Sequence, residues 1–411
     1  MSTRVVVLGG GYAGLLVAGD LARELPRDAE VHVVDEDGEH VVSHLLHRAL
    51  RRPALAATLR LPLADLLEGP TLHRARVTGV DPRRHEVHLA DRADPGQTPE
   101  TMAYDVGVVC LGARPDTGDV AGATAHATTL TTLEDVARLR ERFEALAADP
   151  DGGRVAVVGG GLAGVEVAAE LAALARERDA GVDVYLLEAE RTVAPGFPRE
   201  FRIAVRRELR TRGVTVRPDS EVVAATPDGV RLSDGTHIDC GPVVLETGAT
   251  GPAALDGERA AVDATLAWGA DPAGRTFALG DAARVVDDGG EPVPATARAA
   301  TCAAGPAARN AASVATADGG EAHLEGFAYD ASGWLVSIGD GAVAQAGPTA
   351  FTGAAAKALK SQVSGRYLAA HDAVADAVET VREAFRPPLG GSGGREPATF
   401  DGPRPAPLSR R

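Results

Sequence analysis

Short apolar runs alternate with amphipathic stretches along the chain. Residues 5–8 and 31–34 flank one amphipathic stretch, and residues 155–158 and 184–187 flank another. Runs of about four consecutive apolar residues are typical of strands that are buried on both faces of a parallel sheet. Residues 131–146 have the three-and-four spacing of an amphipathic helix. The pattern therefore predicts an α/β fold.

A glycine turn follows the first apolar run. Gly9, Gly11 and Gly14 have the spacing G-x-G-x-x-G. In this spacing the first glycine permits a tight turn, the second lets backbone approach a pyrophosphate, and the third lets the helix pack on the strand. Asp35 ends the next strand, where a carboxylate can accept hydrogen bonds from a ribose diol. We expect a dinucleotide site here rather than a purely structural turn. The further residues expected to line it are Ala13, Glu36 and Val77.

The same unit returns about 150 residues later. Gly159, Gly161 and Gly164 repeat the glycine spacing between an apolar run and an amphipathic stretch. The resemblance between the two units continues to Gly112 and Gly248, each of which follows two small strands, a turn and a buried strand. A duplication of this length is less expected by chance than one motif, so it predicts two bound dinucleotides.

Glu188 ends the second strand of the repeated unit and indicates which nicotinamide is bound. A carboxylate there accepts a free 2′-hydroxyl and repels a 2′-phosphate, whereas sites for NADPH usually place an arginine nearby. Arg191 leaves NADPH open, but we expect NADH.

Gly280 and Asp281 follow a further predicted apolar strand. After a loop, Pro294 is expected to start a helix that includes Ala297, because proline is accepted in a first helical turn. Asp281 is expected to accept a hydrogen bond from a flavin ribityl hydroxyl while the helix N-terminus faces the ring. The alternative is a surface acid at the end of a strand.

Residues 36–63 are expected to form a loop and a short helix along the edge of a cofactor. His40, His44 and His47 have helical spacing, but no acidic partner is close in sequence, and no metal site is expected. The arginines of this segment, Arg48, Arg51 and Arg52, are expected to face solvent or phosphate. The segment holds no cysteine, so the thiol chemistry of disulfide-reducing flavoenzymes is excluded.

The C-terminal quarter has a different pattern. Residues 325–345 predict a hairpin with Gly333 in its turn. Residues 354–385 predict a long helix with one apolar stripe and an acidic face, suited to packing or to a dimer interface. From Arg386 onward Pro, Gly and polar residues dominate, and disorder is expected.

The amino-acid composition disfavours some classes of binding partner. The net charge of -16 would repel nucleic acid and anionic membranes on average. The three cysteines, Cys110, Cys240 and Cys302, have no metal-ligand spacing, which fits a reducing compartment. With no signal peptide and no membrane span expected, we predict a cytoplasmic protein with at most peripheral contact at the inner face of the cell membrane.

Together these residues resemble flavoproteins with two dinucleotide-binding domains of the glutathione-reductase structural class. They most resemble the type II NADH dehydrogenases, which are NADH:quinone oxidoreductases. The resemblance covers roughly residues 1–370. It rests on GGGYAG at 9–14, CLGARP at 110–115, GGGLAGVE at 159–166, LGD at 279–281, PATARAA at 294–300 and the hairpin at 333–339.

The resemblance implies two Rossmann-like domains, the second inserted in the first, plus a small C-terminal α+β region. Residues 1–118 and 243–315 would bind FAD, and residues 119–242 would bind NAD(P)H. Residues 316–385 would form an interface region, and residues 386–411 a disordered tail. A homodimer would fit this arrangement.

The resemblance also implies roles for three side chains. Glu166 would lie beside the nicotinamide and flavin, where it holds the carboxamide or tunes protonation; the alternative is an ordinary charged helix position. Arg298 and Cys302 stand where family members usually have glutamine, and His44 opens a segment where they usually have Pro-Leu-Leu-Tyr-Gln. These departures lie on the electron-acceptor side, so His44 and Arg298 are candidates for acting on the acceptor.

The expected reaction is hydride transfer from NADH to FAD, followed by delivery of two electrons to a quinone or quinone-like acceptor. Two alternatives stay open. One is a soluble flavin oxidoreductase that acts on a small metabolite or a protein redox carrier. The other is a binding protein in which the flavin and NADH form a long-lived complex that alters dimerisation and so reports redox state.

Overall fold

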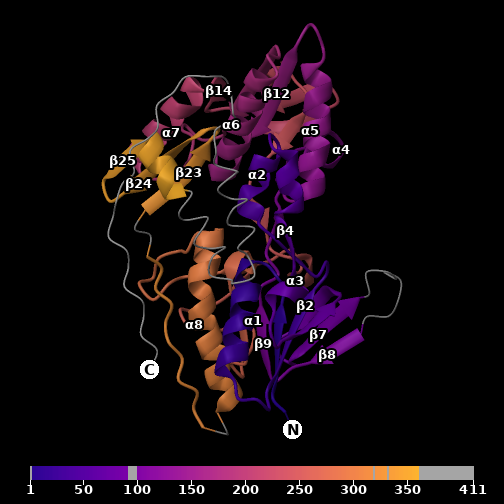
Figure 1. Cartoon of the computed structure of the whole chain (residues 1–411), viewed down its shortest axis with the longest axis vertical. Coiled ribbons are helices and arrows are strands. Elements are labelled where there is room, and N and C mark those ends of the chain that lie inside the picture. The colour runs from indigo at the N-terminus through magenta and orange to yellow at the C-terminus, as the bar shows by residue number, and fades with distance from the viewer. Residues whose placement is uncertain (1, 91–99, 318–319, 331–332, 361–411) are drawn as a thin grey trace.

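Two five-stranded parallel sheets lie toward opposite ends of the molecule (Figure 1). The computed structural model describes residues 2–90, 100–317, 320–330 and 333–360. The first sheet uses strands from the N-terminal third and one returning strand, and the second uses strands from the middle of the chain. The predicted α/β fold is confirmed.

The first sheet has the strand order β21-β9-β1-β2-β5, and each neighbouring pair is parallel. Its strands are β1 (Arg4–Leu8), β2 (Glu30–Asp35), β5 (Thr71–Arg74), β9 (Val106–Val109) and β21 (Thr276–Ala278). The helices α1 (Tyr12–Glu24) and α8 (Ala297–Thr316) lie side by side against it (Figure 1). An antiparallel meander of β6 (Arg76–Asp81), β7 (Glu86–Ala90) and β8 (Glu100–Ala103) joins the same core through Val87 and Leu89.

The second sheet repeats this plan, with the order β11-β18-β12-β13-β14 and parallel pairing throughout. Its strands are β11 (Ala127–Thr128), β12 (Gly153–Val158), β13 (Val182–Leu187), β14 (Val214–Arg217) and β18 (Val243–Leu245). Its helices are α5 (Leu133–Ala147), α6 (Leu162–Glu177) and α7 (Arg199–Thr211). A meander of β15 (Val222–Thr226), β16 (Gly229–Leu232) and β17 (His237–Asp239) corresponds to β6–β8.

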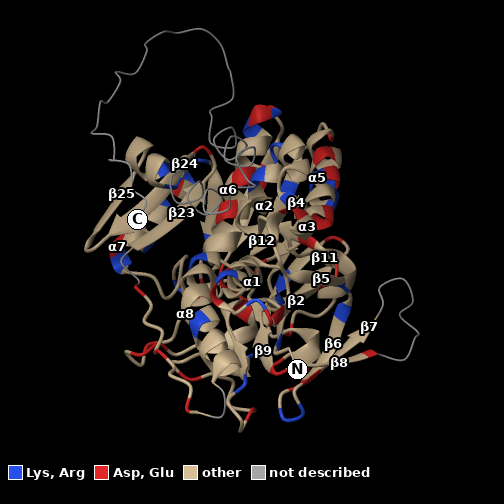
Figure 2. Cartoon of the chain, turned by 60° about the horizontal axis from the view of Figure 1, so that its bottom comes forward, with Lys and Arg blue, Asp and Glu red and all other residues tan. Residues whose placement is uncertain are grey.

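Helix α5 confirms the amphipathic helix expected at 131–146. Thr132 caps its first turn in a capping box with Asp135. Its buried side chains include Leu139 and Phe143, and Figure 2 shows acidic and basic positions interspersed along the helix. The apolar stripe therefore holds the helix to the second sheet.

Two antiparallel segments cross between the two sheets. They are β10 (Arg114–Pro115) and β19 (Ala249–Thr250), which pair with each other. Gly112 and Gly248 precede them, with positive φ angles of 70° and 141°. The two glycines thus occupy corresponding places in the two units.

The boundary expected at residue 243 needs a correction. Strand β18 begins at Val243 but pairs with β12 of the second sheet. The chain leaves that sheet only after Leu245, because the buried strand completes the second unit just as β9 completes the first.

The segment between β2 and β5 folds over the middle of the molecule. It contains β3 (Glu39–Val41), α2 (Leu46–Ala49), β4 (Arg60–Pro62) and α3 (Leu63–Leu66), with the 3-10 helices η1 (Ser43–Leu45) and η2 (Pro53–Ala57). Strands β3 and β4 pair antiparallel. The other short elements are α4 (Ala123–His126), β20 (Ala260–Ala261), β22 (Ala283–Arg284), η3 (Ala253–Leu255) and η4 (Gly280–Ala282).

The C-terminal sheet corrects two further predictions. Strands β23 (Gly333–Ile338), β24 (Gly341–Ala346) and β25 (Thr349–Thr352) form an antiparallel sheet that packs on α6 and α7. The hairpin turn lies at Gly339 and Asp340, and Gly333 begins β23, where a Cβ would meet the Gln345 carbonyl oxygen at 2.6 Å. Helix α8 begins at Ala297 rather than Pro294, because Thr296 is its N-cap.

Of the long helix expected at 354–385, residues 354–360 are helical, and the rest of it, like the tail from 386, lies outside the described residues. Within the part of the chain that the structure describes, no helix has both the length and the hydropathy needed to cross a bilayer.

Candidate functional site

The first glycine turn joins β1 to α1 through contacts that only glycine allows. Gly9 has a positive φ of 99°. A Cβ on Gly14 would lie 1.8 Å from the Gly9 carbonyl oxygen, so α1 packs directly on the turn. In contrast, a Cβ on Gly11 would meet no atom within 4 Å. Gly11 therefore faces open space, where a pyrophosphate could approach the backbone.

The second glycine turn, between β12 and α6, has the same geometry. Gly159 has a φ of 103°, and a Cβ on Gly164 would lie 1.9 Å from the Gly159 carbonyl oxygen. Gly161 again faces open space. The predicted duplication is therefore present in three dimensions as well as in sequence.

The helices that follow these turns begin without a side-chain cap. Gly11 and Gly161 are the N-caps of α1 and α6, and neither has a side-chain oxygen that could accept from the first N–H groups. The helices α5 and α8, by contrast, are capped by Thr132 and Thr296. Uncapped N–H groups at a glycine turn favour an anionic ligand.

The acids at the ends of β2 and β13 hold the two turns. Asp35 Oδ2 accepts a hydrogen bond from Gly10 N at 2.8 Å, and Glu188 Oε2 accepts one from Gly160 N at 2.7 Å. Both predicted acids are thus correctly placed beside their glycines. Their contact with a ribose remains a prediction.

The neighbours expected beside Asp35 have partners of their own. Glu36 pairs with Arg76 at 2.5 Å, and Val77 follows Arg76 in β6. The ion pair therefore places Glu36 beside β6, the strand that contains Val77.

Gly280 and Asp281 lie where α1 and α8 meet. A Cβ on Gly280 would lie 3.5 Å from Ala13 Cβ and 3.4 Å from Ala300 Cβ. Ala297 is the first residue of α8. Burial raises the pKa of Asp281, although Arg259 opposes the shift. The structure therefore brings the predicted strand end against both helices of the first unit.

Glu166, on α6, lies where four segments converge. Its Oε1 accepts hydrogen bonds from Ser337 N at 3.0 Å and Lys360 Nζ at 3.1 Å, and its Oε2 lies 3.5 Å from His47 Nδ1. Burial raises the pKa of Glu166, but attraction by His47 and Lys360 and the bond from Ser337 outweigh it and lower the pKa to about 2. An ordinary charged helix position would not have these partners.

His44 lies beside this cluster and bonds to the first unit. Its Nδ1 is 2.6 Å from the Tyr12 hydroxyl, at the start of α1. Burial, assisted by Lys360, lowers the pKa of His44 to about 3, and burial lowers that of His47 to about 3 as well. Burial raises the pKa of Tyr12 to about 12. At neutral pH both imidazoles are uncharged, so Lys360 is the cation that faces Glu166.

The third histidine of the segment supports the first glycine turn. His40 is buried, and its Nδ1 lies 3.0 Å from the Gly10 carbonyl oxygen. The polar contacts of the three histidines differ, although the His40 and His44 rings both lie against the Tyr12 ring, at centroid distances of 5.1 and 5.8 Å.

The positions of Arg48, in α2, and Arg51, which follows α2, differ from the prediction. Arg48 and Arg51, expected to face solvent or phosphate, are buried. Arg48 Nη1 donates to Glu170 at 2.6 Å and to the Gly339 carbonyl at 2.7 Å, and Arg51 Nη1 lies 3.0 Å from Asp340 Oδ1. Burial raises the pKa of Glu170 more than the arginines lower it. These ion pairs hold α2 between α6 and the β23–β24 turn.

Arg298 lies away from this cluster. Its exposed guanidinium donates to the carbonyls of Asp330 at 3.0 Å and Gly333 at 3.3 Å. These bonds tie the start of α8 to the start of β23, and a role for Arg298 with the acceptor remains a prediction.

Comparison with known proteins identifies the family. Residues 3–328 match the pyridine nucleotide-disulphide oxidoreductase family. The chain belongs to this family. It is 29% identical to the demethylphylloquinone reductase NdbB of a Synechocystis strain over 316 residues, 72% of this chain and 76% of that protein. It is 24% identical to the type II NADH:quinone oxidoreductase of Haemophilus influenzae over 387 residues, 81% and 84% of the two chains.

The fold agrees with a solved structure of NDH2 from Plasmodium falciparum in complex with NADH. The TM-score is 0.78 at 14% identity, over 94% of this chain and 99% of that one. The predicted resemblance to type II NADH dehydrogenases is confirmed, and the protein is a pyridine-nucleotide oxidoreductase of the flavoprotein type.

The two glycine turns fit the cofactors of this family. The predicted use of FAD and NADH is confirmed by the family match, and the open backbone at Gly11 and Gly161 leaves space for two pyrophosphates. The disulfide chemistry in the family's name does not apply, because Cys110, Cys240 and Cys302 are separate, free thiols.

Sequence reasoning missed Lys360 and Tyr12. The sequence nevertheless carries a signal for Lys360, because Lys357 and Lys360 are the two lysines of a chain whose other basic residues are arginines. A lysine supplies a compact ammonium where the rest of the chain supplies planar guanidinium groups.

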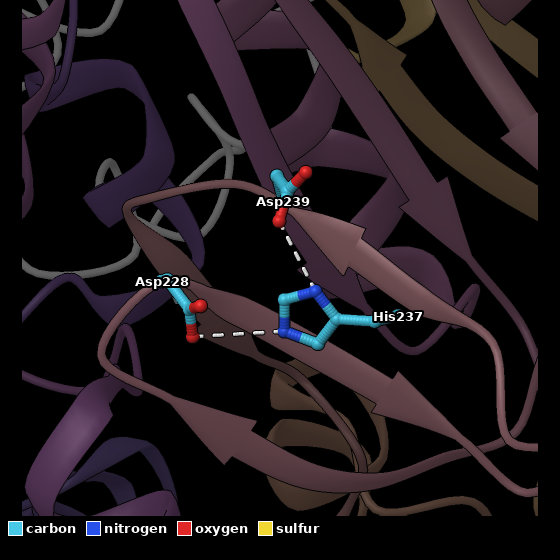
Figure 3. Close-up of side chains that lie close together, drawn as sticks. All are labelled: Asp228, His237 and Asp239. Carbon is cyan, nitrogen blue, oxygen red and sulfur yellow. Dashed lines mark ion pairs between the residues drawn. The ribbon is translucent and has the colours of Figure 1, made fainter.

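One side-chain cluster has the composition of a metal site. Asp228, His237 and Asp239 lie on the β15–β17 meander, with His237 between the two carboxylates (Figure 3). The His237 nitrogens are 3.6 Å from Asp228 and 3.1 Å from Asp239. All three residues are exposed, and exposed groups of this kind commonly form ion pairs without a metal.

Proposed function

We propose that the protein oxidises NADH and reduces a quinone or quinone-like molecule. The overall reaction is NADH + H⁺ + quinone → NAD⁺ + quinol, so two electrons leave the nicotinamide and two hydrogens reach the quinone. Bound FAD supplies the chemistry that accepts a hydride and passes two electrons on.

The first glycine turn would hold the FAD pyrophosphate, and the second would hold that of NADH. Gly9, Gly11 and Gly14 leave N–H groups of α1 for the first anion, and Asp35, which is bonded to Gly10 N, would lie beside the ribose. In the second turn Glu188 takes the place of Asp35 and favours NADH over NADPH.

The cluster around Glu166 is the observation that carries the proposal for the acceptor. Reduction of a quinone requires protons as well as electrons, and a group within hydrogen-bonding reach must supply them. The Lys360 ammonium, held at 3.1 Å by Glu166, is a hydrogen-bond donor, and Glu166 orients it. Tyr12 and His44 form a second hydrogen-bonded pair on the side of the first unit.

The names of the relatives support the same acceptor. One is a demethylphylloquinone reductase and another an NADH:quinone oxidoreductase. Peripheral contact with a membrane and a homodimer stay predictions, and both are compatible with an acceptor that resides in a bilayer.

The test is steady-state oxidation of NADH by the purified, FAD-loaded protein. A short-chain quinone and ferricyanide are compared as acceptors, because ferricyanide takes electrons without protons. The proposal expects turnover with the quinone that depends on Lys360. NADH oxidation by ferricyanide with no reaction toward any quinone tested would overturn the assignment of the acceptor.

A further inference from the structure

Glu246 lies against the second glycine turn. It directly follows β18, at the carboxyl end of the second sheet. A Cβ on Gly159 would lie 2.2 Å from the Glu246 carbonyl oxygen, and a Cβ on Gly164 would lie 3.5 Å from Glu246 Cβ. Glu246 therefore forms one wall of the turn at which the NADH pyrophosphate is placed.

The corresponding residue of the first unit is Cys110. A Cβ on Gly9 would lie 2.5 Å from the Cys110 carbonyl oxygen, and a Cβ on Gly14 would lie 3.3 Å from Cys110 Cβ. Burial raises the pKa of the Cys110 thiol, so it is uncharged. The duplication thus places a neutral side chain beside one dinucleotide turn and a carboxyl group beside the other.

The surroundings of Glu246 disfavour a negative charge. One carboxyl oxygen accepts a hydrogen bond from Leu130 N at 3.2 Å, which favours the ionised form. Burial outweighs this bond and raises the pKa of Glu246 to about 7, and repulsion by Asp135 on α5 acts in the same direction as burial. The glycines of the turn carry no side-chain charge. A second acid, Glu188, accepts a hydrogen bond from Gly160 N of the same turn. A third negative group, the dinucleotide, would therefore enter a region that already holds acids.

We propose that Glu246 is the proton-linked residue of the NADH site: the dinucleotide binds with Glu246 protonated, so binding takes up a proton and weakens as the pH rises. This rests on the placement of NADH at the second glycine turn. The physical cause is repulsion between the pyrophosphate and the ionised carboxylate, which binding relieves by holding the proton.

The affinity for the dinucleotide should therefore fall roughly tenfold between pH 6 and pH 8.5, because one unit of linked pKa change corresponds to a tenfold change in affinity. The Glu246→Gln variant keeps an oxygen for Leu130 N and cannot ionise. Its affinity should be high and independent of pH. The Glu246→Cys variant has at this position the residue type of Cys110 in the first unit, and its affinity should also be independent of pH.

The experiment uses isothermal titration of the oxidised, FAD-loaded protein with NAD⁺, which has the pyrophosphate of NADH and transfers no hydride to the flavin. Titrations at pH 7.5 in phosphate and in Tris, whose protonation enthalpies differ, count the protons taken up. The wild type should take up a measurable fraction of a proton, and Glu246→Gln should take up none. Glu141→Gln, which removes an exposed acid from α5, is the matched control and should behave as wild type.

Proton uptake that is unchanged in Glu246→Gln, or a wild-type affinity that does not vary with pH, would overturn the proposal. Failure of NAD⁺ to bind at any pH would instead overturn the placement of NADH itself, so the two failures are distinguishable.

Discussion

Lys360 Nζ lies 3.1 Å from Glu166 Oε1, although 194 residues separate the two in sequence. The contact joins the helical residues 354–360 to α6 of the second unit. The C-terminal part of the chain therefore contacts the helix that follows the second glycine turn.

Replacement of Lys360 by Gln should lower turnover with a quinone by about 100-fold, the lower range for loss of a positioned proton donor. Turnover with ferricyanide should fall much less, because that acceptor needs no proton. Lys360→Arg should restore part of the quinone activity. Lys357→Gln, which alters the other lysine, is the matched control and should leave both activities near wild type. If Lys360→Gln lost activity equally with both acceptors, a proton-donating role for Lys360 would be refuted.

Gly161→Ala should weaken dinucleotide binding without changing stability, whereas Gly164→Ala should lower stability. A Cβ on Gly161 meets no protein atom, and its φ of -63° suits alanine, so the melting temperature should be unchanged. The methyl group should nevertheless obstruct the pyrophosphate and weaken NAD⁺ binding by about tenfold or more, the cost of a lost hydrogen bond to a charged group.

In Gly164→Ala the Cβ would lie 1.9 Å from the Gly159 carbonyl oxygen, so the fold itself should be destabilised. Thermal melting and NAD⁺ titration of the two variants provide the check. A Gly161→Ala protein that binds NAD⁺ as tightly as wild type would refute the position of the pyrophosphate.

Glu170→Ala should destabilise the protein by about 3 kcal/mol or more, because it leaves Arg48 and Arg51 buried without their shared acceptor. Chemical denaturation followed by far-ultraviolet circular dichroism measures the change. Glu141→Ala, at an exposed position of α5, should stay within about 0.5 kcal/mol of wild type. A small effect of Glu170→Ala would mean that the ion pairs do not hold α2 in place.

Acid should destabilise the fold through the histidines of the site. His47 has a folded-state pKa of about 3 against 6.5 when unfolded, so the unfolded chain binds more protons between these values. Stability is therefore lost as the pH falls through 6.5 toward 3. Glu166, with a folded-state pKa of about 2 against 4.5, acts in the same direction at lower pH.

From pH 7 to pH 5 the titration of His47 should lower the free energy of unfolding by about 2 kcal/mol. The His47→Gln variant should not show this part of the loss. Urea denaturation of both proteins at the two pH values tests this. Equal losses in both proteins would show that His47 is not held neutral in the fold.

The glycine turns could be predicted from sequence because the glycines and the acids of each motif lie within about thirty residues of one another. Gly14 packs on Gly9 five residues earlier, and Asp35 reaches the turn at the end of the next strand. The same local relations hold for Gly164 and Glu188, so both units were expected with their correct glycines and acids.

The site between the units could not be predicted in the same way. Arg48 meets Glu170 across 122 residues and Gly339 across 291, and no local spacing encodes such contacts. An arginine-rich segment therefore suggested solvent or phosphate, although its side chains are buried in ion pairs. His44 and Glu166 were singled out by resemblance, while their partners Tyr12 and Lys360 became apparent only from the packing.

The central claim is that the two glycine turns bind FAD and NADH, and that electrons pass from NADH through FAD to a quinone. Anaerobic spectroscopy of the purified protein tests this claim most directly. A bound flavin should give its visible absorption band, NADH should bleach that band within the time of one turnover, and a short-chain quinone should restore it. A protein that cannot be reconstituted with FAD, or a flavin that NADH does not reduce, would contradict the account.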